Sequence, residues 1–145
     1  MDIEFRLQDE VLKRQLQRVP KEFDRLEQPF SRAGQFILDE TDKNFSSRGS
    51  YFNKKWKRRS PSYEKKATWP ILEKTGDMRS DFDFVALRNQ LRVFNLDRKF
   101  KYHQSSAPRT SNLPRRQMLV LTKKIKAQIV REIQITARKI LTIPR

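Results

Sequence analysis

The balance of charge sets the strongest limit on what this chain can fold into. Its 145 residues carry 33 Lys and Arg against 17 Asp and Glu, a formal net charge of +16. Self-repulsion of this size opposes a compact state, and only 36% of the residues are hydrophobic. Ten Phe and two Trp residues supply large apolar groups for a core. The sequence therefore predicts a folded domain with a lean core and segments that gain order against a partner.

The positive charge increases along the chain. Residues 1–47 hold 8 basic and 10 acidic side chains, for a net charge of −2. Residues 48–97 hold 12 and 6 (net +6), and residues 98–145 hold 13 and 1 (net +12). This asymmetry predicts an acidic partner for the second half, either nucleic acid or the acidic surface of another protein.

The residue types exclude most enzyme and cofactor chemistry. The sequence has no cysteine, which excludes disulfides and thiol catalysis, and its only histidine is His103. Its three glycines form no phosphate-binding loop. Asp81 and Asp83 have the spacing of one strand face, which a solvated surface explains better than a metal site. We expect no enzyme, no catalytic residue, no metal or cofactor and, without a long apolar run, no membrane span.

Apolar residues at alternating steps of four and three predict helices in residues 1–46, which are mainly helical after a short strand over residues 3–7. Pro20 and Pro29 interrupt this stripe, so we expect helices over 9–18, 20–28 and 29–45, packed along one seam. The stripe consists of Leu12, Leu16, Val19, Phe23, Leu26, Phe30, Ala33 and Ile37.

Residues 47–78 form a basic and aromatic loop in this interpretation. Rings and cations alternate over residues 51–70. Such a pattern is found in single-stranded nucleic-acid binders, but a loop whose aromatic side chains hold it to the core is the favoured explanation. Thr75 and Gly76 predict a tight turn, because a backbone that needs positive φ favours glycine.

We expect strands and a loop over residues 79–121. Phe82, Phe84 and Ala86 share one face of a strand, Leu91 and Val93 share a face of a second, and a hairpin tip is expected at residues 89–90. Residues 97–112 look like a loop, and the apolar run Met118–Leu121 predicts a buried strand.

Residues 122–143 predict a C-terminal helix capped by Thr122, with Ile125, Ile129 and Ile133 on its apolar face. The whole chain, 1–145, is then a single α+β domain: N-terminal helices and a C-terminal helix packed on a small antiparallel sheet, with a long basic loop.

Four short motifs occur in an order that resembles a known family. They are Phe52–Trp56 (FNKKW), Ile71–Met78 (ILEKTGDM), Tyr102–Gln104 (YHQ) and Leu113–Leu119 (LPRRQML). With the surrounding residues, about 45 to 122, they resemble the phage virion-morphogenesis family, the tail-completion proteins of Mu-like and P2-like phages. The resemblance implies a structural protein of the head–tail junction, a tail completion or terminator-type neck ring subunit that joins tail to head.

The same resemblance implies partners and a location. The partners are further copies of the chain in a ring, usually a hexamer, neighbouring neck and tail tube or sheath proteins, and non-specific contact with DNA in the lumen. The location is the virion, at the phage neck or tail, after assembly in the host cytoplasm. The alternative is a basic, non-specific nucleic-acid-binding protein.

Several residues are candidates for interaction or for a structural role. Trp56 is either a loop anchor or an interface residue, and His103 is either a pH-sensitive contact or, the favoured choice, a hydrogen-bonded structural residue. Arg115 and Arg116 are expected to pair with acids across a subunit boundary. The full set of interaction candidates is Trp56, Arg58, Arg59, Tyr102, His103, Arg115 and Arg116.

Overall fold

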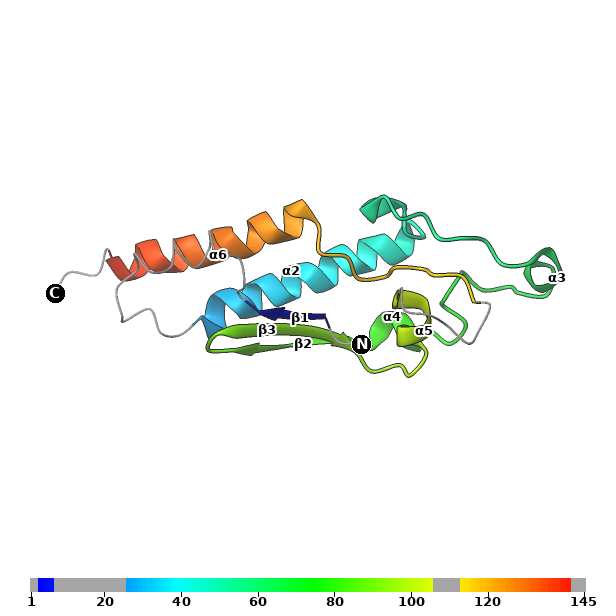
Figure 1. Cartoon of the computed structure of the whole chain (residues 1–145), viewed down its shortest axis with the longest axis horizontal. Coiled ribbons are helices and arrows are strands. Elements are labelled where there is room, and N and C mark those ends of the chain that lie inside the picture. The colour runs from blue at the N-terminus through cyan, green and yellow to red at the C-terminus, as the bar shows by residue number, and fades with distance from the viewer. Residues whose placement is uncertain (1–2, 7–25, 106–112, 142–145) are drawn as a thin grey trace. The chain divides into compact units, whose positions relative to one another are not determined.

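The fold is α+β, as the sequence predicts. A computed structural model describes residues 3–6, 26–105 and 113–141 (Figure 1). The expected helices over 9–18 and most of 20–28 lie outside these residues. The elements are β1 (Ile3–Arg6), α2 (Glu27–Ser46), the 3-10 helix η1 (Ser50–Phe52), α3 (Pro61–Glu64), α4 (Asp77–Ser80), β2 (Phe82–Leu87), β3 (Gln90–Asn95), α5 (Phe100–Gln104) and α6 (Lys123–Leu141).

The chain divides into two compact units. Of the described residues, the first unit contains 38–83, 94–105 and 113–120, and the second contains 3–6, 26–37, 84–93 and 121–141. The boundaries fall inside α2 and inside both strands of the β2–β3 hairpin. Each unit is therefore assembled from segments that are far apart in the sequence.

Helix α2 begins before Pro29 rather than at it. The carbonyl of Leu26 accepts the first helical hydrogen bond, from the amide of Phe30 at 2.9 Å. Pro29 is then the third helical residue, where no N–H is needed because the first-turn donors have no partner within the helix. The break expected at Pro29 is thus wrong, because the proline lies in the first turn of α2, which begins at Glu27.

The second unit packs α2 between α6 and the hairpin (Figure 1). The Arg32 guanidinium on α2 pairs with the Glu132 carboxylate on α6, with Nε and Oε2 2.6 Å apart. On the hairpin side, Gly34 lies directly against the ring of Phe84. The buried side chains are Phe30, Ala33 and Ile37 from α2, Leu91 and Val93 from β3, and Ile125, Ile129 and Ile133 from α6.

The sheet is antiparallel in the order β1-β3-β2. In β1 the backbone of Ile3 pairs with that of Val93, and Arg6 pairs with Gln90. Burial alternates along β2 and β3, as predicted. The hairpin turn falls at residues 88–89, one residue earlier than expected, and the carbonyl of Arg88 accepts a hydrogen bond from the amide of Leu26.

Thr122 caps α6, as predicted. Its hydroxyl accepts a hydrogen bond from the amide of Ile125 at 3.2 Å, and its carbonyl accepts one from the amide of Lys126 at 3.0 Å. The first bond satisfies a donor that has no partner within the helix, and the second is the first regular hydrogen bond of α6. Of the helices described, none is long and apolar enough to cross a membrane.

The basic segment 47–78 is mostly irregular, with η1, α3 and α4 as single turns. Proline is the first residue of α3 and the preceding Ser60 is extended, so the Ser60-Pro61 pair starts a helical turn. The loop expected over 97–112 is corrected at Phe100–Gln104, which form α5. Asp97 begins that turn, because its carboxylate accepts from the amide of Lys99 and its carbonyl accepts from that of Phe100.

Replacing Gly34 by Ala tests the contact between α2 and the hairpin. In a helix interior this change usually stabilises by about 1 kcal/mol. Here the new Cβ would lie 2.5 Å from Cδ2 of Phe84, so we expect a loss of about 1–3 kcal/mol in the free energy of unfolding, measured by urea denaturation. Ser31→Ala, at an exposed position of α2, is the matched control and should be close to neutral.

A double-mutant cycle isolates the cause. In a Phe84→Ala background the space opens, and Gly34→Ala should become stabilising. An equal penalty in both backgrounds would show that Gly34 is needed for some reason other than the Phe84 ring.

Candidate functional site

Residues 113–121 form an irregular segment that is not a strand, and its residues Met118 and Leu119 are buried. Met118 is 0% exposed and Leu119 is 4% exposed, as expected of a core segment. The segment has no helix or strand assignment, so the strand predicted over Met118–Leu121 is wrong. The reason is that side chains, rather than a neighbouring strand, take up the backbone hydrogen bonds of Gln117, Met118 and Leu119.

Gln104, at the end of α5, provides most of these bonds. Its amide oxygen Oε1 accepts from the backbone N–H groups of Met118 at 2.9 Å and Leu119 at 3.1 Å. Its amide nitrogen Nε2 donates to the Leu119 carbonyl at 2.6 Å. One side chain that is 5% exposed thus satisfies three buried backbone groups, each of which would cost about 1–3 kcal/mol if left unpaired.

Asn44 and Trp56 donate further hydrogen bonds to the backbone of the same segment. Asn44 Nδ2 donates to the carbonyls of Met118 (3.2 Å) and Gln117 (3.3 Å), and its Oδ1 accepts from the amide of Phe52. The indole N–H of Trp56 donates to the Gln117 carbonyl at 2.8 Å. Together with Gln104, these side chains make up what we call the amide network.

Trp56 is buried within its own chain, as expected of a loop anchor. Its side chain is 3% exposed, and its ring meets that of Phe45 edge-on with centroids 5.0 Å apart. Gly49 makes this possible: its φ is +87°, and a Cβ there would collide with the Lys54 carbonyl and the indole of Trp56.

Arg116 and Arg115 both bond to their own unit. Arg116 is 6% exposed; its Nε donates to the Lys57 carbonyl at 2.9 Å and its backbone N–H to the His103 carbonyl at 2.8 Å. Arg115 is exposed and donates to the Gln104 carbonyl. Their described partners are backbone oxygens of the same chain, and the pairing with acids across a subunit boundary stays a prediction.

Burial lowers the pKa of Arg116 below its ordinary value, and the positive charge of Arg59 lowers it further, against an opposing effect of Glu64. Arg59 itself is held in place, since its Nη2 donates to the carbonyls of Trp69 (2.8 Å) and Pro70 (2.6 Å). Arg58 is exposed, and so is Tyr102, with the Lys101 ammonium 5.1 Å from its ring centroid. His103 is buried on α5.

Thr75 and Gly76 lie at the start of α4. Gly76 has φ +85°, and the Thr75 hydroxyl donates to the Asp77 carboxylate at 2.7 Å. The helix that follows carries Arg79, whose guanidinium binds Asp42 at 2.6 Å and Glu73 at 3.1 Å. The hydrogen bond from Arg79 holds the pKa of Asp42 below its ordinary value, although burial acts in the opposite direction.

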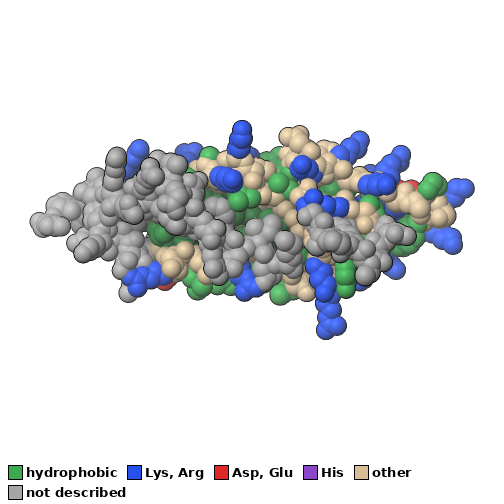
Figure 2. All heavy atoms as spheres, in the orientation of Figure 1, with side chains coloured by type: hydrophobic (Ala, Val, Ile, Leu, Met, Phe, Trp, Pro, Cys, Tyr) green, Lys and Arg blue, Asp and Glu red, His purple; other side chains and the backbone are tan. Residues whose placement is uncertain are grey.

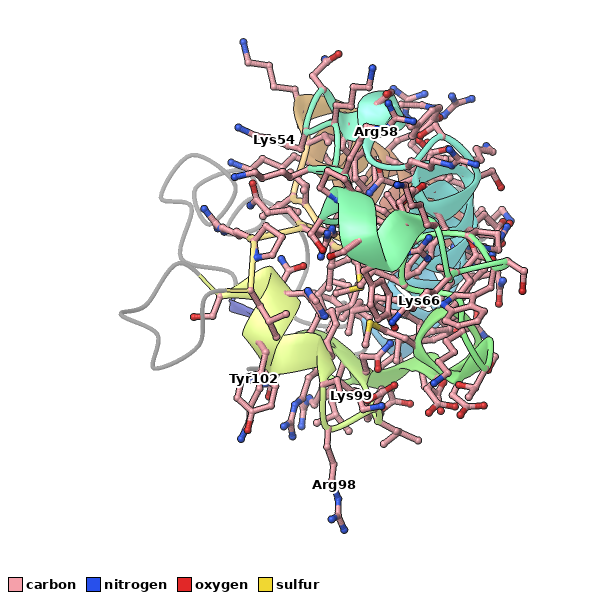
Figure 3. All side chains as sticks on the ribbon, turned by 90° about the vertical axis from the view of Figure 1, so that its right-hand side faces the viewer. Lys54, Arg58, Lys66, Arg98, Lys99 and Tyr102 are labelled. Atoms are coloured by element: carbon pink, nitrogen blue, oxygen red, sulfur yellow. The ribbon has the colours of Figure 1, made fainter. Side chains whose placement is uncertain are left out.

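A cleft of about 850 Å³ opens beside Arg116 in the same unit. Cations from three separate segments line it: residues 57–59 and Lys74 from the first, Lys99 from the second and Arg116 from the third. Figure 3 labels two of these cations, Arg58 and Lys99, and shows Arg98 extending away from the fold. The charged groups favour an anionic ligand.

Neither the residues described nor the comparisons with known proteins identify this site. Within the described parts of the chain, no group of three or more His, Asp or Glu side chains is arranged to hold a metal ion. No protein family, no curated protein and no solved structure matches the chain.

Sequence analysis missed Asn44 and Gly49 and left Gln104 without a role. A signal for Asn44 exists, because it follows Ile37 and Thr41 at helical spacing on the buried face of α2. Its bonding partners, 73 and 74 residues away, have no local signature.

Gln104→Glu gives a pH-dependent test of the amide network. At about pH 7 a carboxylate would face the Leu119 carbonyl without a donor, so we expect a loss of about 3–5 kcal/mol in the free energy of unfolding. Burial raises the pKa of such a carboxyl in the folded state above the unfolded value of about 4.3. The folded state then binds more protons, so stability relative to the unsubstituted protein falls as pH rises from about 4.

Below about pH 4 the protonated carboxyl offers both a donor and an acceptor, and the loss should shrink to about 1 kcal/mol. Urea denaturation across this range measures it, with Gln134→Glu, at an exposed position of α6, as the control. A penalty that stays constant with pH would contradict the assigned bonds.

Proposed function

We propose that this chain is a structural phage protein of the head–tail junction, a tail completion or terminator-type neck ring subunit needed for joining tail to head. The observation that carries the proposal is the convergence of the four motifs on which the resemblance to the virion-morphogenesis family rests. They are separated along the chain, yet in one unit the fourth is hydrogen-bonded to the first and the third and lines the same cleft as the second.

The convergence is specific at the level of atoms. Trp56 of the first motif donates to Gln117 of the fourth, and Gln104 of the third bonds to Met118 and Leu119 of the fourth. The second motif contributes buried residues, Ile71 and Met78, and Met78 lines the same cleft as Arg116. Chance resemblances at four places give no reason for such contacts, whereas a shared fold does.

The charged surface supports a role in assembly. Figure 2 shows Lys and Arg side chains projecting from the visible face, densely around the segment that carries α3, with few acidic groups. A neck subunit meets acidic surfaces of neighbouring proteins and the DNA that passes through the junction. Exposed cations suit both contacts without base-specific recognition.

Immunogold electron microscopy of phage particles tests the proposal directly. Antibody raised against the purified chain should label intact particles at the head–tail junction, and antibody pre-absorbed with the chain is the control. Label on the capsid surface or the tail fibres, or particles without label, would overturn the role of neck subunit.

The alternative function is non-specific nucleic-acid binding. It is favoured by six exposed cations within residues 54–66: Lys54, Lys55, Lys57, Arg58, Lys65 and Lys66. Phe52 and Trp56, in contrast, are buried and are not free to stack on bases. Duplex DNA binding with a slope of log K against log salt of about −0.9 per neutralised phosphate, still tight at physiological salt, would favour this alternative.

A further inference from the structure

The cleft beside Arg116 combines an apolar floor with a cationic rim. Ile71 and Met78 are buried beneath it, and Leu72 and Pro114 add apolar surface. The rim cations are Lys57, Arg58, Arg59, Lys74, Lys99 and Arg116. A ligand that fills this cleft needs negative charge and a bulky apolar group together.

Few acids oppose these cations in the described parts of the chain; Glu64 pairs with Arg59, with Oε2 and Nη1 3.6 Å apart. Asp97 is the single acid among the described residues that line the cleft, and its carboxylate already accepts from the amide of Lys99. No ion pair in the described parts of the chain joins Lys57, Arg58 or Lys99 to an acid. The proximity of Arg59 and Arg116 adds like charge, so an incoming carboxylate finds a favourable field.

The aromatic rings of the cleft are poorly placed for stacking on nucleobases. The Lys74 ammonium lies 5.3 Å from the centroid of Trp69, and the Arg59 guanidinium lies 5.9 Å from that of Tyr63. The two rings also meet each other edge-on, with centroids 6.5 Å apart. Cations thus cover ring faces that bases would need, which favours a peptide over a single-stranded nucleic acid.

The backbone conformation of Leu72 is a second observation that points to a binding site at this cleft. It has φ +65°, a left-handed backbone that is rare for a bulky, γ-branched side chain. Residues held in such conformations concentrate at binding sites, where the surrounding structure maintains them. Here the unusual backbone belongs to a half-exposed leucine on the wall of the cleft.

We propose that this cleft binds an acidic peptide segment of another protein, with a bulky apolar side chain on the floor and flanking carboxylates on the rim cations. The proposal concerns the partner of the cleft and stands whether or not the chain is a phage neck subunit. An apolar anchor between charged contacts is a common arrangement in peptide recognition.

Fluorescence polarisation with the full chain measures binding of a fluorescein-labelled peptide in which Asp and Glu surround one Phe and one Leu. Replacing its Asp and Glu by Asn and Gln should weaken binding at least about tenfold, and so should replacing Phe and Leu by Ser. If the Ser peptide bound as tightly as the peptide with Phe and Leu, the proposal would be overturned, because purely electrostatic attraction does not depend on the apolar floor of the cleft.

Variants of the chain locate the site. Lys57→Gln with Arg58→Gln should weaken binding of the acidic peptide about tenfold. Lys54→Gln with Lys55→Gln removes the same charge from exposed neighbours that do not line the cleft, and should change binding less than about twofold. Equal weakening by both pairs would show general attraction and contradict the assigned cleft.

Leu72→Asn tests the apolar wall of the cleft, since asparagine tolerates the left-handed backbone. It should weaken binding of the acidic peptide about fivefold or more while the thermal midpoint changes little. Two further outcomes would reassign the cleft and overturn the proposal. One is tighter binding of single-stranded oligo-dT than of the peptide, lost in the Lys57 and Arg58 variant; the other is self-association of the chain that the same variant abolishes.

Discussion

The first unit depends on how the backbone of Gln117, Met118 and Leu119 is hydrogen-bonded. A buried extended segment without a neighbouring strand leaves donors and acceptors that water cannot reach. Gln104 and Asn44 bond to these groups, because an amide side chain carries both a hydrogen-bond donor and an acceptor, as the backbone of a neighbouring strand does. The rest of the unit is arranged so that these two amides, and the indole of Trp56, reach one short stretch of chain.

This arrangement connects the core to the charged surface. The segment that the amide network holds begins directly after Arg116, so the network also fixes where that buried cation lies. Arg116 in turn donates to the Lys57 carbonyl and thereby positions the basic segment that forms one side of the cleft. The proposed functions, assembly in a phage neck and capture of an acidic segment, both rely on cations such as Arg59 and Arg116, which donate hydrogen bonds to backbone carbonyls of their own unit.

The elements that sequence predicts best are those with a local signature. The seam of α2, the cap at Thr122 and the alternation along the hairpin each follow from spacing within a few residues. The strand predicted at Met118–Leu121 fails because apolar character shows that a segment is buried, but not which groups bond its backbone. The role of Trp56 stayed open for the same reason, since its partner lies 61 residues away. The cleft joins three distant segments and has no motif of its own.

Amide hydrogen exchange on the unmodified chain tests the central claim most directly. The account predicts that the amides of Met118 and Leu119 exchange only on global unfolding, because each donates to the buried oxygen of Gln104. The neighbouring amide of Gln117 is the internal control; it donates to no oxygen in the described parts of the chain and should exchange faster. Exchange of Met118 and Leu119 as fast as that of Gln117 would contradict the amide network and the role assigned to it.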